Sequence, residues 1–115
     1  MTSSKRDRVL LAEITGVARR LARGRPLTGA EQRDAAAMLS QVAKGRADLL
    51  AESAGLAIGG HEGDPDEARY LQAAQLCIDA GADPGAVPRW IEEGRRRAAG
   101  PAGPVSPAST STTAR

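Results

Sequence analysis

The only histidine of the chain, His61, lies in a short segment rich in acidic residues. The segment 59–64 reads GGHEGD, and Asp66 and Glu67 follow it closely. Histidine and carboxylates bind metals in many proteins, but this spacing matches neither a zinc motif nor an EF-hand calcium loop. A catalytic histidine needs a nucleophile or a paired carboxylate, and no motif in the chain identifies one. We therefore expect an acidic loop with no metal, no cofactor and no enzymatic activity.

The only cysteine, Cys77, lies within a stretch of helical periodicity. A lone cysteine cannot form an internal disulfide, which is typical of a reducing compartment. The first residues, MTSSKRDRVLLAEITG, lack the apolar core of a signal peptide because Glu13 interrupts it. No apolar run reaches the roughly 18–20 residues that a membrane-spanning helix needs. We expect a buried, structural thiol in a cytoplasmic protein that does not enter a membrane.

Two clusters of arginine are candidates for binding an anion. Arg19, Arg20 and Arg23 lie at the end of the first expected helix, and three more arginines end the last one. Cations at a helix C-terminus complement the helix dipole, so helix-end charge is the simplest interpretation of both clusters. The alternative is contact with phosphates, which requires no recognition of bases. The candidate nucleic-acid contacts in the second cluster are Arg95, Arg96 and Arg97.

The formal net charge is only +2, but the charges are unevenly distributed along the chain. Residues 1–25 carry 7 basic and 2 acidic residues, and residues 89–115 carry 5 and 2. Residues 26–88, by contrast, carry 4 basic and 10 acidic residues. Basic ends flanking an acidic middle permit nucleic-acid binding, but they equally permit internal charge pairing or head-to-tail association.

Helical periodicity dominates the first half of the chain. Residues 1–4 are expected to be frayed, although Ser4 can cap a helix over residues 5–23. Thr28 and Glu31 form the pattern of a capping box, which predicts a second helix from Gly29 to residue 58. We expect this helix to continue through Gly45 and to pack on the first helix as a hairpin spanning residues 5–58. A heptad-like seam supports the packing, with Met38, Val42, Gly45, Leu49, Glu52 and Leu56 at its positions.

Residues 64–98 predict two further helices joined by a tight turn. Asp64 is placed to cap the first of them, with Pro65 at its first helical position. Gly81 is a typical helix stop, and the Asp-Pro pair that follows repeats the capping signal. Pro88 would break a continuous helix, so we expect a short turn over 84–87 and a new helix from Pro88.

The stretch AGADPGAVPRWIEEGR, residues 80–95, resembles the turn and second helix of excisionase-like and MerR-like helix-turn-helix proteins. The resemblance implies a helix-turn-helix-like corner over residues 64–98, with its second helix in a major groove of DNA. Arg89 is the residue of this helix that would reach a guanine. The same stretch is also similar to the end of an ankyrin repeat, although the chain has no 33-residue period.

Large apolar residues are scarce in the 115-residue chain, which has 10 Leu, 4 Ile, 5 Val and no Phe. Alanine favours helix but buries little area, so a monomeric core would be thin and a protein partner or self-association would add stability. We expect an all-α fold of about four helices, with one helical domain over residues 5–98. The Pro-, Gly- and Ser-rich residues 99–115 are expected to form a disordered tail.

The leading functional hypothesis is a non-enzymatic binding protein, an adaptor or accessory regulator that acts through helix packing. A buried tryptophan often dominates such contacts, and Trp90 is therefore the first candidate anchor. The other candidate core or interface anchors are Ile91, Leu49 and Met38. The alternative is a small DNA-binding regulator that uses the helix-turn-helix-like segment.

Overall fold

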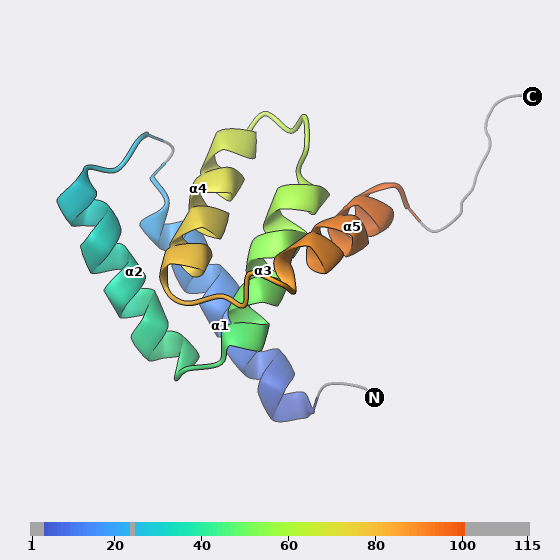
Figure 1. Cartoon of the computed structure of the whole chain (residues 1–115). Coiled ribbons are helices and arrows are strands. Elements are labelled where there is room, and N and C mark those ends of the chain that lie inside the picture. The colour runs from blue at the N-terminus through green and yellow to red at the C-terminus, as the bar shows by residue number, and fades with distance from the viewer. Residues whose placement is uncertain (1–3, 24, 101–115) are drawn as a thin grey trace, which may run out of the picture.

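The computed structural model describes residues 4–23 and 25–100, and in these residues the chain is all-helical, with five helices and no strand (Figure 1). The prediction of an all-α fold is confirmed, with one helix more than expected. The helices are α1 (Lys5–Leu21), α2 (Gly29–Ala43), α3 (Ala47–Gly60), α4 (Glu67–Asp79) and α5 (Val87–Ala98). The predicted tail lies almost wholly outside the described residues. None of the described helices is both long enough and apolar enough to cross a membrane.

The start of α1 is stabilised by two side chains. The Ser4 hydroxyl accepts a hydrogen bond from the Asp7 amide at 3.1 Å, so Ser4 is a cap and not a frayed residue. Arg46 pairs with Asp7 at 2.9 Å and with Asp48 at 2.8 Å. The hydrogen bond from Arg46 lowers the pKa of Asp7, and the first turn of α1 is thereby tied to the beginning of α3.

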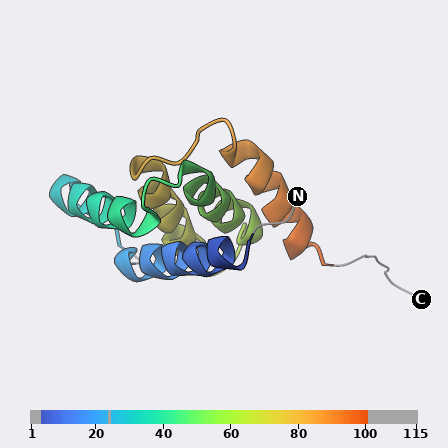
Figure 2. The same cartoon turned by 90° about the horizontal axis from the view of Figure 1, so that it is seen from below.

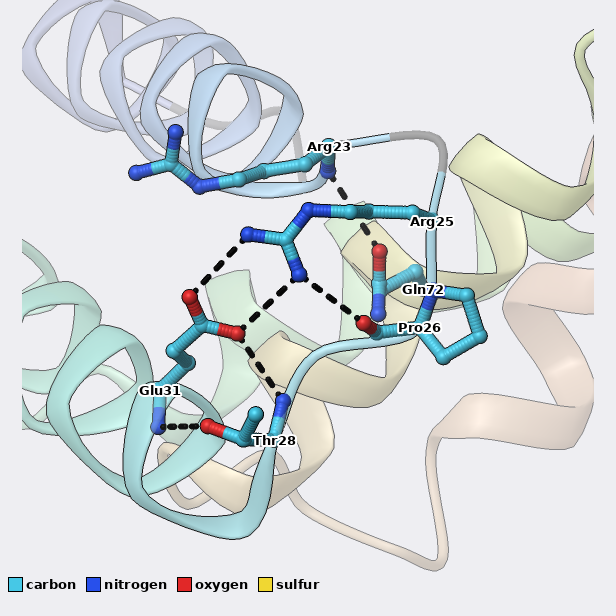
Figure 3. Close-up of polar contacts among 6 residues, drawn as sticks. All are labelled: Arg23, Arg25, Pro26, Thr28, Glu31 and Gln72. Carbon is cyan, nitrogen blue, oxygen red and sulfur yellow. Dashed lines mark hydrogen bonds and ion pairs between the residues drawn. The ribbon is translucent and has the colours of Figure 1, made fainter.

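The predicted capping box at the start of α2 is confirmed (Figure 3). The Thr28 hydroxyl accepts from the Glu31 amide at 3.1 Å, and the Glu31 carboxylate accepts from the Thr28 amide at 2.9 Å. Arg25 also donates to Glu31, at 3.1 and 3.2 Å. The hydrogen bonds from Arg25 and Thr28 lower the pKa of Glu31 to about 2. Local capping therefore sets the beginning of α2.

The loop before α2 is held from α4 by Gln72 (Figure 3). The Arg23 amide donates to Gln72 Oε1 at 3.4 Å. With its amide group turned over, Gln72 donates instead to the Arg25 carbonyl at 3.0 Å and accepts from the Leu27 amide at 3.1 Å. In either orientation, one side chain of α4 fixes the loop that separates α1 from α2.

The expectation of one continuous helix through Gly45 is wrong. Lys44 and Gly45 both have positive φ, 54° and 78°, and this left-handed pair separates α2 from α3. The turn interrupts the heptad-like seam. Leu49 and Leu50 lie in the core after it, whereas Met38 before it is exposed. A straight helix would have carried the apolar residues of 49–59 away from α1 and α4, so burial favours the turn over the local helix preference of this segment.

The predicted start of the helix that follows the acidic loop is also wrong. Helix α4 begins at Glu67, and the Asp64 side chain does not cap it; Asp64 instead pairs with His61 Nδ1 at 2.8 Å. The Asp64 carbonyl accepts from the Glu67 amide at 3.0 Å, so residues 64–66 form a turn. His61, the partner of Asp64, stacks on Tyr70 of α4, and this contact holds the pair close to the start of α4.

The end of α4 and the start of α5 agree with the prediction. Gly81 has φ of +117°, which ends the helix, and α5 begins at Val87 with Pro88 in its first turn. Asp83 organises the turn, because its side chain accepts from the Gly85 amide at 3.0 Å. The Asp83 amide donates to the Ala47 carbonyl at 3.1 Å, which ties the turn to α3.

Helix α3 is the central element, with α4 and α1 packed along it and α5 on another side (Figures 1 and 2). Both views place α2 and α5 at opposite ends of the molecule. The core consists mainly of alanine and leucine. Its most completely buried large side chains are Ile14, Leu39, Leu50, Leu76 and Cys77.

The contact between α3 and α5 depends on glycine. A Cβ atom at Gly55 would lie 2.3 Å from Trp90 Cβ, and one at Gly59 would lie 2.0 Å from the Ile91 carbonyl oxygen. Gly94 faces this contact from α5, where an added Cβ would lie 2.9 Å from the Gly60 nitrogen. The two backbones approach closely only because these side chains are absent. Among the described helices, α5 packs against α3 alone, so α4 and α5 do not form a mutually packed pair.

Candidate functional site

The predicted anchors Trp90 and Ile91 are half-buried and contribute to the fold itself. Both lie on the α5 face that meets α3, and Trp90 packs directly over Gly55. Leu49, the third candidate, is 3% exposed and belongs to the core. Much of the apolar surface of these three residues is therefore used within the chain.

Met38, the fourth candidate anchor, has a different position. It is 54% exposed, and it lines a shallow groove with Leu21, Leu27 and Ala35 at the junction of α1 and α2. The acidic residue Asp34 borders the same groove. Met38 is the one predicted anchor whose side chain is mostly free to meet another molecule.

Arg95, the first of the three arginines that end α5, is bound to two carboxylates. It pairs with Glu92 at 2.7 Å on the same helix and with Glu62 at 3.0 Å in the loop after α3. Arg95 donates hydrogen bonds to the Glu62 carboxylate, and these bonds raise the pKa of Arg95. Its charge is balanced within the molecule.

Arg96 and Arg97 share the carboxylate of Glu93. Arg97 lies 2.8 Å from it, and Arg96 donates to both of its oxygens. These bonds lower the pKa of Glu93, which is 22% exposed. Arg89, which would reach a guanine in the helix-turn-helix interpretation, is exposed and forms no ion pair with any described residue. The candidate phosphate contacts of α5 are thus already occupied, while the candidate base contact is free.

The cations of α1 differ from those of α5, because none of them forms an ion pair with a residue in the described part of the chain. Helical spacing places most of them on one exposed face, which we call the α1 outer face. Ala12 and Gly16 lie between them, and Asp7, already bound by Arg46, points away from this face. The cations of the α1 outer face are Lys5, Arg8, Arg19 and Arg20 within the helix, and we include the exposed Arg23, which follows the end of α1.

The end of α1 carries a further cation from α4. Arg69 donates to the Arg19 carbonyl at 2.9 Å and to the Ala22 carbonyl at 3.1 Å. It therefore satisfies carbonyl groups that the end of α1 leaves free, where a positive charge is favoured. In Figure 3 the Arg23 side chain extends alongside that of Arg25, and its guanidinium has no partner among the residues drawn. Local positive charge is concentrated at this end of α1.

Figure 2 shows α1 along one edge of the molecule, with no other helix below it in that view. The α1 outer face is consequently an accessible row of unpaired cations. From the sequence, only Arg19, Arg20 and Arg23 of this row were expected to form a cluster. The helical spacing of Lys5 and Arg8 could have extended it, but their lack of ion-pair partners became apparent only in the structure.

His61 and Cys77 show no arrangement typical of catalysis. His61 is paired with Asp64, and the Ser53 hydroxyl lies 2.9 Å from the Thr15 hydroxyl rather than against a base. Burial raises the pKa of the Cys77 thiol to about 11, which disfavours the reactive thiolate. Within residues 4–23 and 25–100, no three His, Cys, Asp or Glu side chains gather as metal ligands.

The chain was also compared with known proteins. It matches no protein-family model, and it has no significant match among curated proteins or among solved structures.

Proposed function

We propose that this chain is a non-enzymatic helical binding protein, an adaptor or accessory regulator that acts through the α1 outer face. The proposal rests on a difference between the cations of α1 and those of α5. The α1 cations have no ion-pair partner among residues 4–23 and 25–100, whereas the three arginines that end α5 are neutralised by carboxylates. An array of unpaired cations on one helix face attracts a polyanion, because the charges act together and release its counterions.

Duplex DNA is the polyanion that fits this face. The distance from Lys5 to Arg20 along α1 is roughly 22 Å at 1.5 Å per residue, which corresponds to about six base-pair steps of duplex DNA. Val9 is the only large apolar side chain that α1 exposes, and Ala12 and Gly16 are small. This composition favours contact with phosphates over insertion into a membrane, which needs bulky apolar residues. Phosphate contacts carry no sequence information, so we expect little sequence preference.

The test uses two triple variants that remove the same charge from different helices. The first replaces Arg8, Arg20 and Arg23 with Gln, and the matched control replaces the three paired arginines of residues 95–97 with Gln. Binding to a fluorescein-labelled duplex is measured by anisotropy at about 50 and 200 mM salt, where phosphate contacts weaken most. We expect the α1 variant to lose at least tenfold in affinity and about three units of salt slope, and the control to bind like the wild type.

Three results would contradict the proposal. Absence of salt-sensitive binding by the wild-type protein would exclude DNA as the ligand. Equal loss in both triple variants would attribute binding to net charge rather than to the α1 outer face. Loss of affinity in the control variant alone would place the interface on α5.

The helix-turn-helix-like segment is the second candidate surface for DNA, and it is favoured by Arg89, which is exposed and has no ion-pair partner in the part of the chain that the structure describes. Arg89→Gln separates the two surfaces. A base contact predicts a loss of affinity for particular sequences, of about 1–3 kcal/mol. The α1 interface predicts no change.

A protein partner is the other candidate ligand, and the exposed side chain of Met38 favours it. The partner that fits this groove is an amphipathic helix that offers an apolar side chain to Met38 and a cation to Asp34, which forms no ion pair in the described part of the chain. Light-scattering mass of the wild type and of Met38→Ser tests whether a second copy supplies that helix. A dimer that Met38→Ser dissociates would support self-association, and a monomeric wild type would exclude it.

A further inference from the structure

A partly enclosed cavity lies where α1, α3 and α4 meet, and Arg19 of the α1 outer face is part of its lining. Its volume is about 140 Å³. Engineered protein cavities of roughly 150 Å³ accept a benzene molecule, so this cavity has room for one small ring or a branched chain. It is too small for a nucleotide or a peptide side chain with its backbone.

One wall of the cavity is apolar and another carries hydroxyl groups. Leu56, Ala57 and Ala73 line the apolar part. On the polar side, the Thr15 and Ser53 hydroxyls lie 2.9 Å apart, and Ser53 is only 5% exposed. The Ser53 hydroxyl also forms a hydrogen bond with the Cys77 side chain, so this wall is polar but its hydroxyls already have partners within the chain.

The mouth of the cavity is aromatic and cationic. The His61 and Tyr70 rings stack with centroids 3.5 Å apart and an interplanar angle of 2°. Asp64 holds the His61 ring through Nδ1 but does not line the cavity. The Arg19 guanidinium lies 5.4 Å from the Tyr70 ring centre and has no carboxylate partner in the described residues. The lining includes a cation and hydroxyl groups but no carboxylate.

We propose that this cavity binds a small cyclic or branched monocarboxylate. The apolar body of the ligand lies against Ala57 and Ala73, and its carboxylate lies at the mouth, where Arg19 supplies a charge-assisted hydrogen bond. The proposal does not depend on DNA binding: Arg19 belongs to both surfaces, but the DNA test replaces Arg8, Arg20 and Arg23, none of which lines the cavity.

The composition of the chain makes the test simple, because it has one Tyr, one Trp and one His. Proton NMR of the full chain therefore resolves each aromatic ring, and a non-aromatic probe adds no signals among them. We expect cyclopentanecarboxylate to shift the Tyr70 and His61 resonances in a saturable manner. Trp90, which packs on Gly55 at the α5 contact, serves as the internal control and should not shift. The neutral isostere cyclopentanecarboxamide should bind at least tenfold more weakly.

Two variants locate the site. Arg19→Gln should weaken binding of the carboxylate about tenfold, the usual effect of losing one hydrogen bond to a charged group. Arg20→Gln is the matched control, because it removes the same charge from the neighbouring residue, which does not line the cavity. Ala57→Leu should fill the space and abolish binding while Trp90 keeps its native chemical shift.

The proposal is overturned if cyclopentanecarboxylate causes no saturable Tyr70 shift in the wild type. It is equally overturned if the amide binds as well as the carboxylate, or if Arg19→Gln and Arg20→Gln have the same affinity. The surface variant Arg19→Gln keeps the test decisive even if Ala57→Leu does not fold. Failure here would leave the DNA measurements on Arg8, Arg20 and Arg23 unaffected.

Discussion

Gly59→Ala is expected to detach α5 from α3. The added Cβ would lie 2.0 Å from the Ile91 carbonyl oxygen and 3.0 Å from the Arg95 nitrogen. Ordinary contacts of a Cβ atom begin near 3.4 Å, so the Ile91 oxygen would have to move by about 1.4 Å. Both neighbours are backbone atoms, which cannot rotate away as a side chain can. The strain must therefore displace the whole of α5.

The expected magnitude follows from two opposing effects. Replacing Gly by Ala inside a helix removes a propensity penalty of about 1 kcal/mol. Overpacking a tight contact costs about 1–3 kcal/mol and more where the neighbour is rigid. At Gly59 the second effect is larger, and we expect a net loss of about 2 kcal/mol in the free energy of unfolding. For a domain of this size, that loss lowers Tm by roughly 10 °C.

Gly16→Ala is the matched control, since Gly16 also lies inside a helix. A Cβ there would meet only Arg20 Nη1, at an ordinary 3.6 Å. The propensity gain should therefore remain, and Tm should rise by a few degrees. The same substitution thus has opposite signs at the two positions.

Circular dichroism during thermal and urea unfolding measures both variants. Trp90 is the only tryptophan, so its fluorescence reports separately on the α3–α5 contact. In Gly59→Ala we expect red-shifted Trp90 emission before the main transition. If Gly59→Ala melts as high as Gly16→Ala with native emission, the close packing of α3 and α5 described above is refuted.

Four further predictions follow from individual contacts. Hydrogen bonds from Arg25 and Thr28 lower the pKa of Glu31 from 4.5 to about 2, so its stabilising contribution is complete above about pH 4.5 and is lost as the pH falls towards 2. In Glu31→Gln, the free energy of unfolding measured with urea should therefore depend less on pH over that range. Thr28→Ala should cost about 1 kcal/mol in the same assay, and Thr28→Ser much less. Cys77 should not react with a thiol reagent at pH 8 until urea unfolds the chain, because burial raises its pKa to about 11. Lys44→Asn should stabilise the chain by about 0.5 kcal/mol, since asparagine tolerates the left-handed φ of 54° better than lysine.

A specific result would contradict each of these predictions. A Glu31→Gln protein with the same pH dependence as the wild type would show that the carboxylate adds nothing to stability. Equal losses in the Ala and Ser variants of Thr28 would argue against the cap. Rapid labelling of Cys77 in the native protein would contradict its burial, and a destabilised Lys44→Asn protein would assign the lysine side chain a role of its own.

Several helix boundaries could be predicted because the interactions that set them are local. Ser4 and Thr28 cap the helices that follow them, and each contacts an amide three residues away. Gly81 ends α4 through its own backbone conformation. Such signals involve only near neighbours in the chain, and they act in the same way whatever the rest of the fold does.

The predictions that failed concern positions where another contact outweighs the local helix preference. Asp64 resembles a helix cap, yet it pairs with His61, which Tyr70 holds by stacking. The turn at Lys44 and Gly45 interrupts a helix that local propensity favours, because the break lets Leu49 and the residues after it face the core. Neither competing contact could be predicted from residue spacing in the sequence.

The same distinction applies to the candidate surfaces. Composition and periodicity predicted an all-helical chain with basic ends and identified most of the arginines that are candidate anion contacts, because charge and helix propensity belong to single residues. Which arginines are free depends on pairs such as Arg95 with Glu62, which are 33 residues apart in the sequence. The cavity beside Tyr70 likewise combines residues from three helices. Charge neutralisation and enclosure are properties of groups brought together in space, so only the tertiary structure could decide them.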